Sequence, residues 1–215
     1  MKGGVNMDTL VEQYEHEGIP VEIHWDDNPM SPREWTNVGT ILHWHRSYDF
    51  GESIEGRDME AVERGGMKLL VRWLQLTRGA TCVLPLGLLD HSGLHMWVGG
   101  GSHWTDSAGW DSGTVGVIFD TTESREETGV ELENVEKALR QEIEEYDAYL
   151  RGEVYGYVVA HDEPDMDSCW GFIGDIKWAK EEAESSAEYI AKERRAKAEA
   201  SYRAKRVIVA RRGVT

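Results

Sequence analysis

The sequence predicts an α+β fold with a mostly antiparallel sheet, two packed helices and a long C-terminal helix. Three observations lead to this prediction. Most of the short apolar segments are joined by turn-like connections, only two long amphipathic stretches lie between them, and the last part of the chain is highly charged with a regular alanine spacing. Parallel strands need crossover connections of a dozen or more residues, so short connections favour antiparallel pairing.

The N-terminal part of the chain predicts two strands with a loop between them. Residues 21–25 alternate apolar and polar side chains, as a half-buried strand does. Residues 26–32 contain two prolines beside Asp and Asn, which close turns, and predict a loop. Residues 38–45 predict the second strand, which runs into the turn-like segment 46–51.

The central part predicts a helix followed by three strands. Apolar residues of segment 58–76 fall near one helical face, although Gly65 and Gly66 each cost helix stability by about 1 kcal/mol. Apolar segments then predict strands over residues 82–89, 94–98 and 114–120. A glycine-rich polar stretch, residues 99–109, separates the last two strands.

The second amphipathic stretch, residues 132–150, has apolar residues spaced by three or four positions and predicts a helix. Gly152 is suited to end it in the left-handed conformation. Residues 154–160 and 169–173 predict two further strands.

Residues 175–206 predict one long helix with Asp175 as its N-cap. Alanines recur every four residues along it and form a narrow stripe of small side chains: Ala179, Ala183, Ala187 and Ala191. We therefore expect an α+β domain over residues 1–174 and a C-terminal helix with a basic tail over residues 175–215. No run of about 18 apolar residues and no apolar N-terminal segment is present, so neither a membrane helix nor a signal peptide is expected.

The charge is unevenly distributed. The chain has a formal net charge of −17, but residues 1–180 hold 14 basic and 34 acidic side chains, whereas residues 192–215 hold nine basic and two acidic ones. Because residues 1–180 are so acidic, we expect them to repel nucleic-acid backbones and anionic membranes and to attract basic surfaces. The basic tail suits contact with nucleic acid, docking on an acidic surface, or a solvated helix end.

Polar side chains cluster in two short segments on either side of the glycine-rich stretch. The candidate ligand-binding residues are Asp90, His91, Ser92, Trp110, Asp111 and Ser112. Neighbouring residues on an extended chain point in alternate directions, which argues against a catalytic triad at 90–92. A tight turn explains each segment structurally, whereas an indole beside carboxylates and a hydroxyl also suits a small-molecule or nucleotide pocket. We assign no catalytic residue.

His43 and His45 share one face of a predicted strand, because they are two positions apart. Together with Asp90, His91, His95 or His103 they are candidate ligands for zinc or another divalent cation. The competing interpretation is a partly buried pair whose ring N–H groups donate to backbone carbonyls.

Acidic side chains of residues 123–147 and of the loop 162–168 are candidates for binding a basic partner. These residues are Glu126, Glu127, Glu142, Glu144, Glu145, Asp162, Glu163, Asp165 and Asp167. The loop lacks the glycine and glutamate spacing of an EF-hand. A continuous face formed by both groups would favour a binding function.

Seven short segments, in this order, resemble a family of small proteins encoded by bacteriophages and integrated mobile elements. They are SPREW at 31–35, WHRSY at 44–48, LPL at 84–86, DHSG at 90–93, WDSGTVG at 110–116, YLRGEVYG at 149–156 and SCWGF at 168–172. The resemblance spans residues 20–178 and implies a phage accessory protein in the host cytoplasm. The resemblance implies no catalytic role for any residue of this chain. The chain differs from the family pattern at residues 87–89 and 99–109.

Three functions are compatible with these observations. The first is an acidic inhibitor, of the anti-CRISPR or anti-restriction type, that binds a basic nucleic-acid-binding surface of a host protein by mimicking nucleic acid. The second is a small-molecule or nucleotide-binding protein, or a metal-dependent enzyme, that uses the region from Asp90 to Asp111. The third is a virion or assembly protein, in which the alanine-striped helix supports a homo-oligomer.

Overall fold

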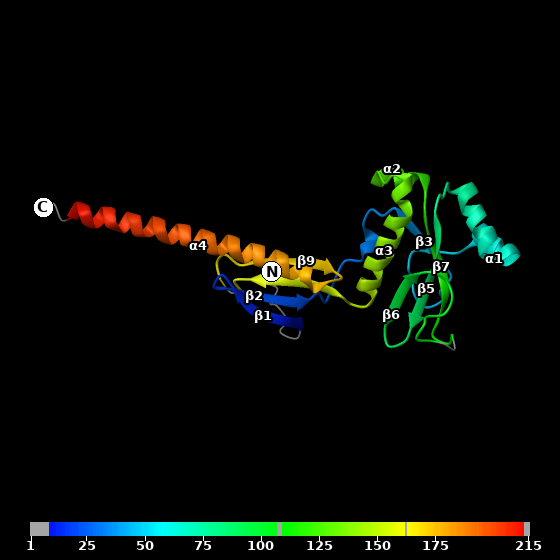
Figure 1. Cartoon of the computed structure of the whole chain (residues 1–215), viewed down its shortest axis with the longest axis horizontal. Helices are drawn as coiled ribbons and strands as arrows, with labels where there is room; N and C mark the ends of the chain where they lie inside the picture. The colour runs from blue at the N-terminus through cyan, green and yellow to red at the C-terminus, as the bar shows by residue number, and fades with distance from the viewer. Residues whose placement is uncertain (1–8, 107–108, 162, 213–215) are drawn as a thin grey trace. The chain divides into compact units, whose positions relative to one another are not determined.

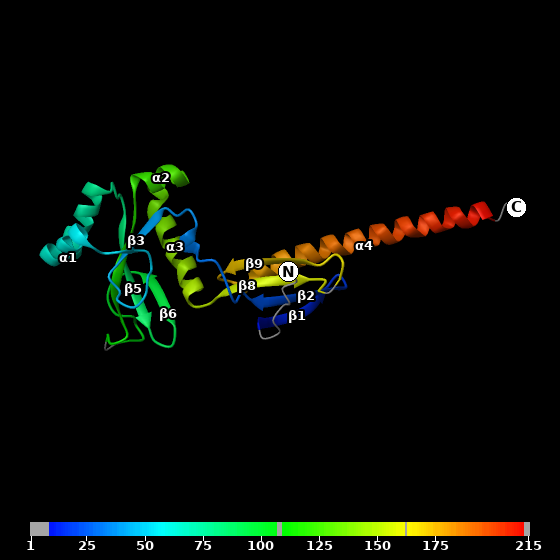
Figure 2. The same ribbon diagram turned by 180° about the vertical axis from the view of Figure 1, so that it is seen from behind.

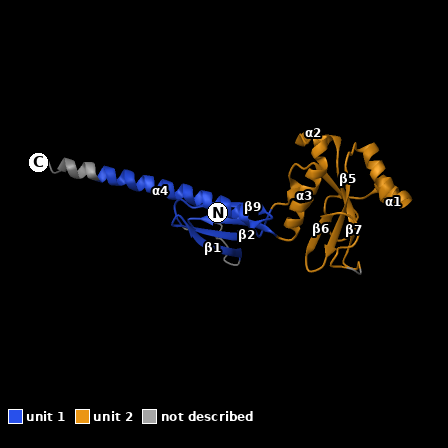
Figure 3. Ribbon diagram, viewed as in Figure 1, with its two compact units in different colours: residues 1–29, 153–215 blue, residues 30–152 orange. Residues whose placement is uncertain are grey.

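The computed structural model describes residues 9–106, 109–161 and 163–212, with the side chains of the last helix described as far as residue 205 (Figure 1). The chain forms two compact units (Figure 3). Unit 1 consists of residues 1–29 and 153–215, and unit 2 consists of residues 30–152. These boundaries differ from the expected division between residues 174 and 175, because the long C-terminal helix is part of unit 1.

Unit 1 is a four-stranded antiparallel sheet with a helix packed on it. The strand order is β1 (Leu10–His16), β2 (Ile19–Trp25), β8 (Val154–Val159) and β9 (Asp167–Ile173). The helix is α4 (Ile176–Arg212). Strand β1 was not predicted, because it is an edge strand whose residues are mostly exposed and which lacks an apolar alternation.

The alanine stripe of α4 is the surface that faces the sheet. Ala179, Ala183 and Ala187 are completely buried and belong to one core with Val21 and Val159. Small side chains allow the helix backbone to lie close to the strands. Asp175 caps the helix as predicted, since its Oδ1 accepts a hydrogen bond from the backbone N–H of Lys177 at 2.9 Å.

Unit 2 is a five-stranded sheet in the order β4 (Glu52–Ser53), β3 (Gly39–His43), β7 (Ser112–Asp120), β5 (Val83–Asp90) and β6 (Leu94–Val98). All pairs are antiparallel except β3 with β4. Helix α3 (Val135–Leu150) packs on one face and helix α1 (Gly56–Thr77) on the other (Figure 2). Short helices η2 (Pro32–Glu34), α2 (Thr122–Thr128) and η3 (Leu132–Asn134) complete the unit.

A buried carboxylate joins three segments of unit 2 at the end of β7. Asp120 is fully buried and accepts hydrogen bonds from Thr81 N at 2.9 Å, Thr81 Oγ1 at 2.7 Å and Cys82 N at 2.7 Å. It also forms an ion pair with Arg125 of α2, whose guanidinium donates to Gly79 O as well. The network therefore fixes the start of β5 and helix α2 to the end of β7.

The α+β fold class with antiparallel sheets and a long C-terminal helix is confirmed. The strands belong to two separate sheets, and the short α2 was not predicted. Helix α1 is bent at Gly66, which has a φ of 62° and a ψ of −157°. Within the described residues, no helix is both long and apolar enough to cross a membrane.

Candidate functional site

The two predicted polar segments meet around one open pocket in unit 2. Strand β5 ends at Asp90 where β7 begins at Ser112, and Asp90 N donates to Asp111 O at 2.8 Å. The pocket encloses about 300 Å³ and has Asp90, Trp110, Asp111 and Ser112 in its lining, together with His45. Antiparallel pairing of β5 with β7 thus brings together four of the six predicted ligand-binding residues.

The other two predicted residues form the turn beside the pocket. His91 N donates to Gly93 O at 3.1 Å, and Ser92 has a φ of 59°. The His91 ring lies 3.1 Å from Asp111, between Nδ1 and Oδ2, but both side chains are largely exposed. An exposed pair of this kind contributes little to stability. Neither His91 nor Ser92 lines the pocket. The tight turn expected for this segment accounts for the position of both residues.

Asp106, which was not among the predicted residues, holds three residues that line the pocket. Its carboxylate accepts hydrogen bonds from Ser112 Oγ at 2.8 Å, Asp111 N at 2.9 Å and Trp110 N at 3.2 Å. The hydrogen bond from Ser112 is the main reason that the pKa of Asp106 lies below its usual range. The Asp-x-x-Gly spacing from Asp106 to Gly109 was the available turn signal, and Gly109 N donates to Asp106 O at 3.1 Å.

The lining of this pocket suits a cation. Asp90 and Asp111 supply carboxylates, and Trp110, which is 87% exposed, is also part of the lining. An aromatic face attracts an ammonium or guanidinium group, and a carboxylate pairs with it. The same carboxylates repel a phosphate, which argues against the nucleotide version of the predicted pocket.

The candidate metal ligands His43 and His45 both lie beside Phe50, with ring centroids 5.7 and 5.8 Å from its ring. His43 is almost completely buried; its Nε2 is 3.4 Å from Asp49 Oδ1, within ion-pair range but without hydrogen-bond geometry. His45 Nδ1 accepts from the backbone N–H groups of Ser47 and Tyr48, at 3.2 Å each. Among the described residues, no three His, Cys, Asp or Glu side chains are grouped to hold a metal ion.

The candidate acids of α2 and α3 fall into two classes. Glu126, Glu127, Glu144 and Glu145 are exposed. The base of the Glu145 side chain is nevertheless shielded in part from water, and this partial burial, together with the nearby Glu142, raises the pKa of Glu145. Glu142 is instead a structural residue. It accepts from Val38 N at 2.7 Å and pairs with Arg33 at 3.0 Å, with only 15% of its side chain exposed.

The candidate acids of the loop 162–168 belong to unit 1, so the structure does not show one continuous face with those of unit 2. Glu163 and Asp165 both pair with Arg194 of α4 at 2.6 Å, and this arginine lowers the pKa of Asp165. Asp167 accepts from Ser186 Oγ at 2.6 Å. Asp162 lies outside the described residues.

The first part of the basic tail forms ion pairs with acidic side chains elsewhere in unit 1. Arg194 binds the loop acids, and Arg195 pairs with Glu17 at 2.5 Å. These two arginines therefore fill one of the roles expected for the tail, docking on an acidic surface.

No family model, curated protein or solved structure matches the chain. The resemblance to phage-encoded proteins stays a prediction.

Proposed function

We propose that the chain is a non-catalytic binding protein that presents the carboxylates of α2, η3 and α3 to a basic surface of another protein. The observation that carries this proposal is a set of exposed glutamates that form no ion pair with any other described residue. They are Glu123, Glu126, Glu127, Glu131, Glu133, Glu144 and Glu145.

Electrostatics favours a basic partner for this surface. Residues 121–147 contain ten acidic and three basic side chains, and two of those three bases are already paired, Arg125 with Asp120 and Arg140 with Glu136. Complementary charge raises association rates and suppresses wrong partners. Many basic protein surfaces are nucleic-acid-binding sites. With the phage setting that the seven sequence motifs imply, we propose a host nucleic-acid-handling or defence protein in the cytoplasm as the partner.

A pull-down from nuclease-treated host lysate tests this proposal. The wild-type chain is expected to enrich one nucleic-acid-binding protein at low salt and to lose most of it at moderate salt, because exposed charges are screened beyond a Debye length of about 8 Å at roughly 0.15 M salt. The variant Glu126→Lys/Glu127→Lys is expected to lose the partner already at low salt.

The matched control is Glu181→Lys/Glu182→Lys, which makes the same charge change on exposed residues of α4. If both variants lose the partner equally, the net charge of the chain explains the binding and the α2 surface does not. If neither higher salt nor the α2 variant weakens capture of the partner, the proposed surface is contradicted.

A second candidate function is the binding of a small cation in the pocket beside Asp90. The convergence of Trp110 with two carboxylates around a cavity of about 300 Å³ favours it. Spermidine and arginine methyl ester are expected to bind, whereas AMP is not. Calorimetric titration should show affinity for both cations falling by about tenfold in Asp111→Asn, the loss of one charge-assisted hydrogen bond.

The control for the pocket is Glu127→Gln, an exposed acid on α2 that removes the same charge. Affinity for AMP comparable to that for spermidine, or equal weakening in both variants, would exclude a dedicated cation pocket.

A further inference from the structure

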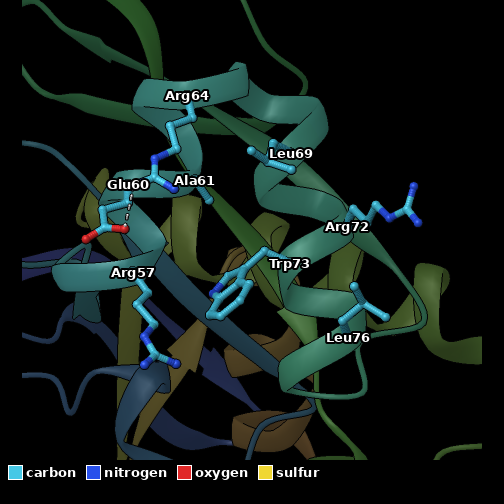
Figure 4. A pocket seen from close by; sticks show the side chains of 8 residues that line it. All are labelled: Arg57, Glu60, Ala61, Arg64, Leu69, Arg72, Trp73 and Leu76. Carbon is cyan, nitrogen blue, oxygen red and sulfur yellow. Dashed lines mark ion pairs between the residues drawn. The ribbon is translucent and has the colours of Figure 1, made fainter.

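Helix α1 carries a groove that differs in charge from the rest of the described surface of unit 2. The bend at Gly66 sets residues 56–65 at an angle to residues 67–77, and one face of each half lines a cavity of about 350 Å³ (Figure 4). Residues 56–78 contain five basic and three acidic side chains, in a chain whose net charge is −17.

The centre of the groove is apolar. Leu69 is 38% exposed and Leu76 is 74% exposed, and Trp73 lies between them. The Trp73 indole is held in place, because its Nε1–H donates to Asp58 Oδ1 at 2.8 Å. Exposed leucines beside a fixed aromatic ring form a preorganised apolar contact surface.

Arginines surround this apolar centre. Figure 4 shows Arg57 and Arg64 on the first half of the helix and Arg72 on the second, with guanidiniums that point in different directions. Arg64 is 3.5 Å from Glu60, while Arg57 and Arg72 form no ion pair with the described residues. Three separated guanidiniums do not converge on one compact anion. They fit a partner that has an apolar group in the middle and carboxylates around it.

The same unit exposes a segment with that chemistry. Leu132, at the start of η3 between α2 and α3, is 65% exposed, and Glu131 and Glu133 on either side of it are also exposed. Neither glutamate forms an ion pair with any described residue, and Glu131 makes no side-chain capping bond to η3. We call Glu131, Leu132 and Glu133 the acidic corner.

We propose that the acidic corner of one copy docks into the α1 groove of a second copy. Leu132 would contact the surface formed by Leu69, Trp73 and Leu76, while the two glutamates pair with arginines of the rim. The contact joins two different surfaces, so it is a head-to-tail contact that can repeat from copy to copy. It goes beyond the proposed function, with whose surface it shares Glu131 and Glu133, and it uses none of the residues changed in the test of that function.

The strength of this contact depends on the salt concentration. Two copies with a charge of −17 each repel at long range. At roughly 0.15 M salt the Debye length is about 8 Å, so distant charges are screened while ion pairs in direct contact, partly shielded by apolar groups, persist. Self-association is therefore expected to be stronger at this salt concentration than at low salt.

Sedimentation velocity over a concentration series, at that salt concentration, tests the proposal. The average mass of the wild-type chain is expected to rise with concentration. The groove variant Arg64→Glu/Arg72→Glu and the corner variant Glu131→Arg/Glu133→Arg are each expected to weaken self-association by about tenfold or more, because like charges then face each other. The chain carrying all four changes is expected to associate again, since both surfaces have exchanged sign.

The four-change variant also serves as a folding control, because a misfolded groove would not restore association. Circular dichroism of each double variant should match the wild type, since all four residues are exposed. The matched charge control, Glu181→Arg/Glu182→Arg on α4, should leave self-association unchanged. A wild-type chain that stays monomeric at every concentration and salt would overturn the proposal, as would association that either double variant leaves intact or that the four-change variant fails to restore.

Discussion

Replacing Asp120 by alanine is expected to lower the free energy of unfolding of unit 2 by about 3–5 kcal/mol, the usual effect of removing one partner of a buried ion pair. The variant leaves Arg125, whose side chain is only 14% exposed, without its carboxylate partner. It also removes the acceptor of the backbone N–H groups of Thr81 and Cys82. These donors lose their acceptor, and because Cys82 is half-buried, water replaces the lost hydrogen bonds only in part, which adds to the cost.

Urea denaturation with hydrogen exchange at the amides of β5 and β7 measures this effect in unit 2 specifically. Asp120→Asn should lose less stability than Asp120→Ala, because its amide oxygen still accepts one of the hydrogen bonds. Glu127→Ala, an exposed acid on the neighbouring helix α2, should change stability by less than about 0.5 kcal/mol. A loss below about 1 kcal/mol in Asp120→Ala would mean that the network contributes no more than an ordinary hydrogen bond.

Replacing Ala183 by leucine is expected to destabilise unit 1 by about 1–3 kcal/mol, the typical cost of adding methylenes to a packed core. Ala183 is fully buried between α4 and the sheet, in the same core as Val21 and Val159. A leucine there pushes the helix away from the strands and weakens the contacts of its neighbours in the alanine stripe.

Thermal unfolding, with hydrogen exchange at the amides of β2 and β8, tests this prediction. Ser185→Leu adds a leucine to an exposed position of the same helix and should leave stability nearly unchanged. If both variants behaved alike, close packing of the alanine stripe would not be what holds α4 on the sheet.

The sequence predicted most of the strands and the three long helices, because their apolar spacing reflects which face is buried. It missed β1, whose exposed edge position removes the apolar alternation. It also missed α2, which has no buried residue and begins with a capping box between Thr121 and Ser124. Such a helix depends on its cap and on Arg125 rather than on an apolar stripe.

Pairing partners are the part of the fold that spacing does not contain. Apolar alternation in β2 shows that one face is buried, but not that the strand pairs with β8, far along the chain, instead of with β3. The single expected sheet therefore proved to be two.

The candidate site was predictable in its residue types, which the two polar segments display. That the segments meet depends on the pairing of β5 with β7, which spacing does not contain. Glu142 was misjudged for the same reason. Its partners Arg33 and Val38 N are about a hundred positions away, and nothing at position 142 distinguishes it from the exposed glutamates nearby.

The order of the two units along the chain has a consequence for biosynthesis. Unit 1 is discontinuous, with the whole of unit 2 inserted between β2 and β8. About 130 residues separate the end of β2 from the start of β8. At about 5–20 residues per second, β2 therefore waits for β8 for roughly 6–26 s, during which the whole of unit 2 is made. Early folding of unit 2 shortens the effective loop that β2 and β8 must close, which lowers the entropic cost of joining them. The nascent chain is therefore expected to become protease-resistant first in residues 30–152, and in residues 10–25 only after α4 has left the exit tunnel.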